Sequence, residues 1–379
     1  MAGIYIHIPF CKQACHYCDF HFSTTLNRKD NMIKTLVKEL VLRKDEFTND
    51  FIETIYLGGG TPSLLSIDEI QLLTDTIYQN YKVINDPEIT LEANPDDLTV
   101  EKIQQLVNSP ISRLSIGIQS FFDEDLKAMN RAHTALEAKR SLKQASLYFD
   151  NITIDLIYGI PNMSIEHWKQ NIRTAIDIGV HHISSYALTV EPKTALESFI
   201  RQGKYPKLSE ELALEHFNTL MEETEKEGFV QYEISNFGKP GYFSKHNTSY
   251  WLGKKYLGIG PSAHSFDGKF RSWNISNNIK YIKAIAAGIL PKEDEELTLN
   301  DRFNETIMTG LRTIWGVSMS EVEQNFGISY KEHLVKKSGK FIEQGLLFMD
   351  AECEKSDVLK TTNKGKFLCD GIASEIFMI

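Results

Sequence analysis

The sequence predicts an α/β protein, with a parallel β-sheet covered by helices on its outside and a smaller domain towards the C-terminus. Short apolar runs alternate six times with longer segments whose apolar residues recur at every third or fourth position, and these are the periods of strands and helices. Six such units in succession are typical of an open doubly wound sheet or of a full or partial barrel. A chain of 379 residues is long enough for a barrel-sized domain and one or two smaller ones.

The alternating elements lie in the first half of the chain. The predicted strands are residues 4–8, 54–57, 88–92, 113–118, 151–157 and 182–188. The predicted helices between them include residues 31–45, 67–81, 100–107, 136–148 and 165–178. Because the loops after parallel strands share one end of the sheet, we expect these loops to form the working surface of the protein.

The pattern changes after about residue 190. One amphipathic helix is expected over residues 209–228, and a Gly- and aromatic-rich region with little periodicity follows at residues 232–273. From about residue 299, three helical segments precede strand-like runs at residues 345–349 and 358–362, which suggests a compact, winged-helix-like α+β domain. The predicted parts are therefore a barrel domain over 1–230, a connecting region over 231–298 and the winged-helix-like domain over 299–379.

Composition and charge exclude several classes of protein. With 42% apolar and 24% charged residues, the chain has the composition of a folded domain. No apolar stretch approaches the length of a membrane span and the first residues do not resemble a signal peptide, so we expect a cytoplasmic protein. A net charge of −10 argues against nucleic acid as a partner. In a reducing compartment, the isolated Cys353 and Cys369 are expected to be ordinary unpaired thiols.

The other three cysteines form a cluster. Cys11, Cys15 and Cys18 lie within eight positions, directly after the first predicted strand. In the cytoplasm such a cluster more often holds a metal centre than a disulfide. The spacing allows a zinc ion bound by three cysteines and either His16 or His21. It also allows an iron–sulfur cluster with three thiolate ligands, which would leave one iron open to another ligand.

Glycines and polar side chains follow the other predicted strands. Residues 58–62, with the sequence GGGTP, form a turn that exposes backbone N–H groups. Glu92, Gln119 and Asp155 stand at or near the ends of the next three strands. Asp155 lies in an apolar run, where a carboxylate is costly to bury unless it is paired or ligand-bound. Arg131 is a candidate partner for Asp155. Alternatively, Arg131 is a solvated arginine at the end of a helix. The alignment of these residues predicts one composite site for a polar ligand beside the cysteine loop.

Two motifs resemble those of the radical S-adenosylmethionine (SAM) superfamily. The Cys-x3-Cys-x2-Cys loop has an aromatic residue just before its last cysteine, and the GGGTP turn is similar to the motif that meets the methionine amino group of SAM. The resemblance runs through the whole chain, including residues 5–11 and the C-terminal tail. It is closest to the branch of oxygen-independent coproporphyrinogen III oxidases and their relatives, the haem chaperones. It implies a partial (β/α)6 barrel, similar to part of a TIM barrel, that carries a C-terminal domain.

The resemblance also implies cofactors and their ligands. Cys11, Cys15 and Cys18 would bind a [4Fe–4S] cluster, and the methionyl amine and carboxylate of SAM would chelate the fourth iron. The reduced cluster would cleave SAM, and the protein would hold the cluster and SAM in position. Since SAM carries a sulfonium, an ammonium, a carboxylate and a ribose, acids, an amide and an arginine are suitable partners. The positions that match the SAM-lining positions of the oxidase branch are Tyr5, Gly59, Gly60, Thr61, Glu92, Gln119, Arg131 and Asp155.

Three features separate this sequence from the oxidases. The oxidases have a further cysteine where this sequence has Phe20, and they have a long segment before the first strand, which here is expected to begin at about residue 4. Residues 246–251, with the sequence HNTSYW, match the HNxxYW motif of the haem chaperones. This match makes His246 the expected haem ligand, with His264 as a weaker alternative. Without this match, His246 would be expected to be a buried histidine with a structural role.

These observations favour a haem chaperone on a radical SAM scaffold, which binds haem, a [4Fe–4S] cluster and SAM and transfers haem to acceptor proteins. A transient membrane-associated acceptor and a homodimer are compatible with this hypothesis. One alternative is a radical SAM enzyme of the coproporphyrinogen III oxidase type, which Phe20 and the short N-terminal segment disfavour. A second alternative is a zinc-stabilised binding module, which explains the cysteines and none of the strand-end residues. No catalytic residue is assigned.

Overall fold

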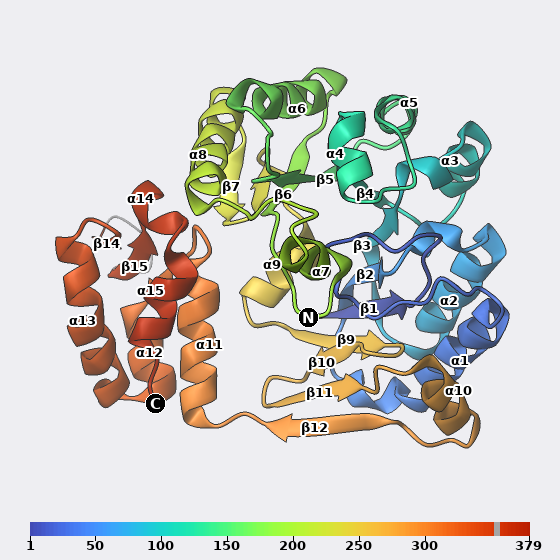
Figure 1. The fold of residues 1–379 in the computed structure, drawn as a ribbon. Helices are drawn as coiled ribbons and strands as arrows, with labels where there is room; N and C mark the ends of the chain where they lie inside the picture. The colour runs from blue at the N-terminus through green and yellow to red at the C-terminus, as the bar shows by residue number, and fades with distance from the viewer. Residues whose placement is uncertain (352–356) are drawn as a thin grey trace.

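The fold consists of a long sheet, a layer of helices outside it and a smaller unit at the C-terminus (Figure 1). The computed structural model describes residues 1–351 and 357–379, so Cys353 lies outside the described residues. The strand order in the large sheet is β12-β11-β10-β9-β1-β2-β3-β4-β5-β6-β8-β7. A second sheet has the order β13-β15-β14. The predicted α/β class with an additional C-terminal domain is confirmed.

The six predicted strands are present and run parallel to one another. They are β1 (Ala2–Ile8), β2 (Ile52–Gly59), β3 (Val83–Ala93), β4 (Arg113–Gln119), β5 (Ile152–Tyr158) and β6 (His182–Ala187). All seven residues of β4 are buried, because helices and the barrel interior cover both faces. β1 pairs with β2 on one side and with β9 on the other, not with β6. The six strands therefore form a partial barrel that does not close.

Helices connect the parallel strands on the outside of the sheet. They are α1 (Lys29–Leu42), α2 (Ile67–Asn80), α3 (Val100–Val107), α4 (Asp123–Ala128), α5 (Ala135–Ala145) and α6 (Ile165–Ile178). After β6 come α7 (Ala195–Arg201), whose Leu196 N–H donates to the carbonyl of His16 in the cysteine loop, and α8 (Glu210–Lys226). Capping side chains fix where several of them begin. Ser66 and Glu69 exchange side-chain and backbone hydrogen bonds at the start of α2, and Thr134 and Glu137 do so at the start of α5. None of the helices described is both long enough and apolar enough to cross a bilayer.

The region of little periodicity, residues 232–273, contains regular structure that its sequence pattern did not indicate. The structure contains β7 (Val230–Glu233), β8 (Asn236–Gly238), α9 (Lys245–Trp251), β9 (Lys255–Ile259), β10 (His264–Phe266) and β11 (Phe270–Asn274), followed by α10 (Asn278–Ala286) and β12 (Lys292–Glu296). These strands are too short for an alternating pattern to stand out in the sequence. Gly258 interrupts the apolar run of β9 because the backbone carbonyl of His264 leaves no room for a Cβ there.

The C-terminal unit, residues 299–379, has its own apolar core. It contains α11 (Leu299–Leu311), β13 (Val317–Ser318), α12 (Met319–Phe326), α13 (Ile328–Glu343), β14 (Leu347–Asp350), β15 (Val358–Thr361), α14 (Asn363–Lys366) and α15 (Cys369–Ile376). The three expected helices and two expected strands are present, and β13, α14 and α15 were not predicted. Phe303, Ile307 and Leu334 are fully buried in this core, and Cys369 is a free thiol that is 1% exposed. The three domain boundaries given above stay a prediction.

Both ends of the large sheet are connected to the C-terminal unit. At one end, β12 leads directly into α11 (Figure 1). At the other end, the backbone N–H of Ile234 donates to the carbonyl of Arg312 at 3.0 Å, and the N–H of Ile314 donates to the carbonyl of Tyr232 at 3.1 Å. The residues after α11 thus form a short antiparallel pairing with the end of β7.

Candidate functional site

The cysteine loop leaves the sheet at the end of β1. The N–H of Cys11 donates to the carbonyl of Ser23 at 3.1 Å, which closes the base of the loop. Cys11, Cys15 and Cys18 are free and partly exposed, and burial raises the pKa of Cys18 to about 11. Among the described residues, the three thiols and the nearby histidines do not form a group close enough to bind one ion. His16 instead bonds to the carbonyl of Ala128.

A cavity of about 590 Å³ lies over the carboxyl ends of the parallel strands. We call it the cluster-loop cavity. The structure places ten of the predicted site residues in its lining, which are Cys11, Cys15, Cys18, Gly59, Gly60, Thr61, Glu92, Gln119, Arg131 and Asp155. The expectation that residues from successive strand ends share one surface is therefore met in the geometry, although their roles stay predictions.

The GGGTP turn brings backbone N–H groups to the edge of this cavity. Gly59 has a φ of +105°, and a Cβ at this position would collide with the ring of His7, so only glycine fits. The N–H of Gly59 donates to Glu92 Oε2 at 3.0 Å. The hydroxyl of Tyr56 donates to Glu92 Oε1 at 2.8 Å. The turn and the neighbouring strand therefore fix the Glu92 carboxylate in place.

Two carboxylic acids in the cluster-loop cavity have shifted pKa values. Burial raises the pKa of Glu92 to about 7, against the lowering effect of its hydrogen bond from Tyr56. Burial also raises the pKa of Asp155 to about 7, against the positive charges of Arg113 and Arg131. A cationic ligand would favour the charged form of both acids. Such shifts are typical of functional sites, because burying an acid has a cost in stability that a functional role can offset.

Arg131 is not a solvated arginine at a helix end. Its Nη1 donates to the sulfur of Cys15 at 3.3 Å, and its Nη2 donates to Asn94 Oδ1 at 2.6 Å and to the carbonyl of Gly117 at 3.0 Å. Among the described contacts, Arg131 makes no hydrogen bond to Asp155, its predicted partner. Its positive charge alone lowers the pKa of Asp155. A cation held against Cys15 suits a loop whose thiolates carry negative charge.

Tyr5 is the one predicted SAM residue that lies elsewhere. It lines a second, larger cavity of about 1120 Å³, which we call the hairpin cavity because residues of β10 and β11 form one of its walls. The ring of Tyr5 stacks on that of Tyr56 at a centroid distance of 6.0 Å. The two cavities are neighbours, since their linings share four residues: Asp19, Phe20, Gly59 and Glu92.

His246 is enclosed by its neighbours. Its side chain is 2% exposed, with Nδ1 2.7 Å from the hydroxyl of Thr54 and Nε2 2.8 Å from the hydroxyl of Tyr250. Its backbone N–H donates to Glu88 at 3.0 Å, which anchors the start of α9. Burial lowers the pKa of His246 to about 3, so the ring is neutral. Both ring nitrogens are occupied, and an iron atom could reach neither without displacing a hydroxyl.

The rest of the HNxxYW motif reaches both cavities. Asn247 lines the cluster-loop cavity, whereas Tyr250 and Trp251 line the hairpin cavity. Sequence reasoning did not assign Asn247 to the SAM side, and it also missed further lining residues, namely Tyr17, Tyr56, Asn94, Ser115, Gly117, Ser184 and Tyr186. Ser184 could have been found, because it is a polar residue inside the strand-like run of β6.

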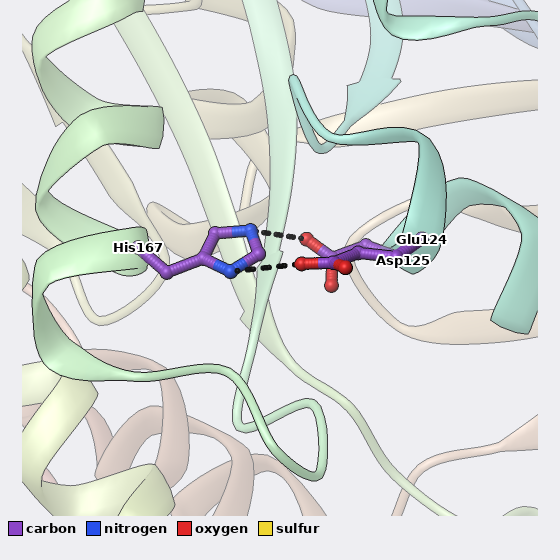
Figure 2. Close-up of side chains that lie close together, drawn as sticks. All are labelled: Glu124, Asp125 and His167. Carbon is purple, nitrogen blue, oxygen red and sulfur yellow. Dashed lines mark ion pairs between the residues drawn. The ribbon is translucent and has the colours of Figure 1, made fainter.

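A third group of polar side chains lies away from the two cavities, between α4 and α6. Figure 2 shows His167 facing the carboxylates of Glu124 and Asp125. Its Nδ1 lies 3.4 Å from Glu124 and its Nε2 lies 3.1 Å from Asp125. Asp125 also accepts a hydrogen bond from Ser120 at 2.5 Å. Because each ring nitrogen faces a different acid, the group serves to join the two helices.

Comparisons with known proteins agree with this geometry. The sequence matches the Radical SAM superfamily over residues 5–175 and the HemN C-terminal domain over residues 297–366. The heme chaperone HemW of Bacillus subtilis is 34% identical over 372 residues, which cover 97% of each chain. The heme chaperone HemW of Escherichia coli is 37% identical over 266 residues, which cover 69% of each chain.

A solved structure extends the comparison to the fold. Coproporphyrinogen III oxidase (HemN) from Escherichia coli matches with a TM-score of 0.84 over 100% of this chain and 90% of that one. The two sequences are 21% identical, so this likeness concerns the fold alone.

The sequence, the partial barrel and the cysteine loop define a member of the radical SAM superfamily. This membership implies a [4Fe–4S] cluster and SAM, and three free thiols in one cavity, with Arg131 against Cys15, fit such a cluster. Within the superfamily, the chain belongs to the HemW family of haem chaperones.

Proposed function

We propose that this protein is a haem chaperone, which binds haem and transfers it to acceptor proteins in the cytoplasm. The observation that carries the proposal is the pair of adjoining cavities: one holds the complete set of strand-end residues beside the cysteine loop, and the other is larger and lined by aromatic side chains. The similarity to HemW proteins over nearly the whole chain supports the same function.

The cluster-loop cavity is proposed to hold the [4Fe–4S] cluster and SAM. Cys11, Cys15 and Cys18 would bind three of the irons. The backbone of the GGGTP turn, Glu92 and Asp155 suit the ammonium and sulfonium groups, while Gln119 and Arg131 offer donors to carboxylate and ribose oxygens. Gln119, which lines this cavity at the end of β4, has a φ of 66°, an uncommon conformation for a residue other than glycine.

The direct test is a haem titration of the anaerobically purified full-length protein. Saturable binding, followed by transfer of the haem to an apo-haemoprotein that is added as acceptor, is the expected result. Size-exclusion chromatography during the titration would show whether the protein acts as a homodimer, and addition of lipid vesicles bearing an acceptor would test a membrane-associated partner. No saturable binding of haem by the wild-type protein would overturn the proposed function.

A second candidate is a radical SAM coproporphyrinogen III oxidase. It is favoured by the fold likeness to HemN and by the complete set of strand-end residues. The reconstituted protein would be incubated with coproporphyrinogen III, SAM and a reductant, and the products separated by chromatography. We expect no decarboxylated porphyrinogen; its formation at a rate that depends on SAM would replace the chaperone proposal by the oxidase.

A further inference from the structure

Three side chains that can bind a metal ion meet between α4 and α6, outside both cavities (Figure 2). One ligand atom each from Glu124, Asp125 and His167 lies within 4.8 Å of the other two. Glu124 and Asp125 belong to α4, and His167 belongs to α6. Among the described residues, no other histidine, cysteine and carboxylate atoms converge on one point in this way. An imidazole together with carboxylates is a donor set that suits zinc and related divalent ions.

The contact between His167 and Asp125 is close without being a hydrogen bond. Nε2 of His167 lies 3.1 Å from Asp125 Oδ2, yet this buried nitrogen has no hydrogen-bond partner among the described residues. In a hydrogen-bonded ion pair, the ring N–H would point at the carboxylate oxygen. Two atoms that are 3.1 Å apart and each about 2.1 Å from one ion subtend roughly 95° at that ion, which is an ordinary angle between metal ligands.

The imidazole ring of His167 is also held from its other side. Nδ1 lies 3.4 Å from Glu124 Oε1, and the ring of Phe122 packs on the imidazole with a centroid distance of 3.7 Å. A histidine that binds a metal through one nitrogen commonly has a carboxylate beside the other, which fixes the orientation of the ring. The Glu124 side chain is 75% exposed, so it can move towards an ion without disturbing the core.

A buried polar group supports Asp125 from behind. Asp125 is 5% exposed and accepts a hydrogen bond from Ser120 at 2.5 Å. The same hydroxyl lies 3.3 Å from Oδ1 of Asn171, which is fully buried one helical turn after His167. The N–H of Phe121 donates to that Oδ1 at 2.7 Å, so the amide orientation is fixed, and Nδ2 has no acceptor among the described residues. A water molecule bound to an ion beside Asp125 would supply this missing acceptor.

The charges at this point also favour a cation. Among the described residues, neither Glu124 nor Asp125 forms an ion pair with a lysine or an arginine. Burial raises the pKa of Asp125, against the lowering effect of the hydrogen bond from Ser120. A divalent ion would stabilise the charged form of both acids at once.

We propose that His167 Nε2, Asp125 and Glu124 bind a divalent transition-metal ion of the zinc type, with water in the remaining coordination positions. This ion is separate from the iron–sulfur cluster and from the haem of the proposed function. Its role is structural, because its ligands belong to two helices that pack outside the sheet. The ion would also fix the turn between β4 and α4, where Ser120 directly follows Gln119 of the cluster-loop cavity.

The test is a calorimetric titration of zinc chloride into the full-length protein with its iron–sulfur cluster in place, so that the loop thiols are not free to bind zinc. The proteins compared are the wild type, His167→Gln, Glu124→Gln and the control His181→Gln. His181 is a matched control because it faces a single acid, Asp150, at 3.9 Å. We expect His167→Gln to bind one equivalent of zinc fewer than the wild type, and Glu124→Gln to bind that equivalent at least about tenfold more weakly. The control should bind as the wild type does.

Thermal unfolding of the same four proteins gives a second readout. Zinc should raise the unfolding midpoint of the wild type and of His181→Gln, and it should leave that of His167→Gln unchanged, because an ion stabilises only the folded form that binds it. Equal zinc stoichiometry in the wild type and His167→Gln would overturn the proposal. If His167→Gln does not fold, Glu124→Gln decides, since its side chain is exposed; unchanged zinc affinity in that variant would overturn the proposal. Tighter binding of magnesium than of zinc would also overturn it, because magnesium prefers oxygen ligands to imidazole.

Discussion

The guanidinium of Arg312 lies 5.1 Å from the centre of the Trp251 ring. The same group donates to Glu233 at 2.8 Å and to Asp370 at 2.6 Å. Arg312 belongs to the C-terminal unit, Trp251 to the HNxxYW motif and Glu233 to the end of β7. One side chain therefore connects the motif, the sheet and the last helix of the chain.

Replacing Arg312 should destabilise the protein strongly. Glu233 is 0% exposed, and Arg312→Ala leaves its carboxylate without a counter-charge. The expected loss is about 3 kcal/mol in the free energy of unfolding, because breaking one side of a buried ion pair costs that order. Chemical denaturation monitored by circular dichroism measures it.

Arg173→Ala is the matched control for that variant. Arg173 is 54% exposed and pairs with Glu166 at 3.6 Å, so its removal should change the free energy of unfolding by at most about 1 kcal/mol. Equal losses in the two variants would show that the Arg312 contacts contribute no more than a surface ion pair.

Each cysteine of the loop should be required for the iron–sulfur cluster. Cys15→Ser removes a soft thiolate ligand, so anaerobically reconstituted protein should lose most of its iron, its sulfide and its visible absorbance. Cys369→Ser is the control, because this thiol lies in the core of the C-terminal unit and away from the loop. A cluster that persists in Cys15→Ser, or one that is lost in Cys369→Ser, would contradict the assignment.

Glu92 should contribute to SAM affinity through its charge. Glu92→Gln removes a charge-assisted contact worth about 1.5–3 kcal/mol, so SAM should bind roughly 10- to 100-fold more weakly by calorimetry. The exposed Glu101→Gln on α3 should bind SAM as the wild type does. An unchanged affinity in Glu92→Gln would place the cationic groups of SAM elsewhere.

The same residue predicts a pH dependence. The pKa of Glu92 is about 7 in the folded protein without ligand, so the carboxyl is mostly neutral below that pH and mostly charged above it. A cationic ligand binds the charged form, so SAM affinity should rise between about pH 6 and pH 8. Glu92→Gln should flatten that rise, with Asp155 accounting for what remains.

Buried histidines should make the protein sensitive to acid. Burial lowers the pKa of His246 to about 3 and that of His7 to about 4, below their value in the unfolded chain. Between those values and about pH 6.5 the unfolded state binds more protons, so the free energy of unfolding falls as the pH falls, by up to about 1.4 kcal/mol per pH unit for each histidine. Denaturation midpoints at a series of pH values would show the trend. His246→Gln should reduce the slope by one histidine's share, and an identical slope would contradict the predicted burial effect.

The sequence predicted the site best where a residue type has few structural roles. The cysteine loop, the glycine turn and the isolated polar residues at the strand ends, such as Glu92 and Asp155, indicated a shared site because parallel strands bring those ends together. The presence of β1 to β6 followed from period alone, whereas their side-by-side order in a partial barrel was implied by the family resemblance.

Other features depended on contacts between distant segments, which no local pattern records. β9 is a strand because it pairs with β1, although Gly258 weakens its own propensity. The hairpin cavity combines residues from the N-terminal loop, β10 and α11. The enclosure of His246 depends on Thr54, which lies 192 positions away in the chain.

The attachment of both sheet ends to the C-terminal unit has a measurable consequence. Any widening of the partial barrel that moves β7 away from this unit must break the backbone hydrogen bonds of Ile234 and Ile314. Amide hydrogen exchange at these two positions therefore reports on opening of the sheet. If haem loading or release requires the cavity walls to separate, these amides will exchange faster during transfer to an acceptor than in the resting protein.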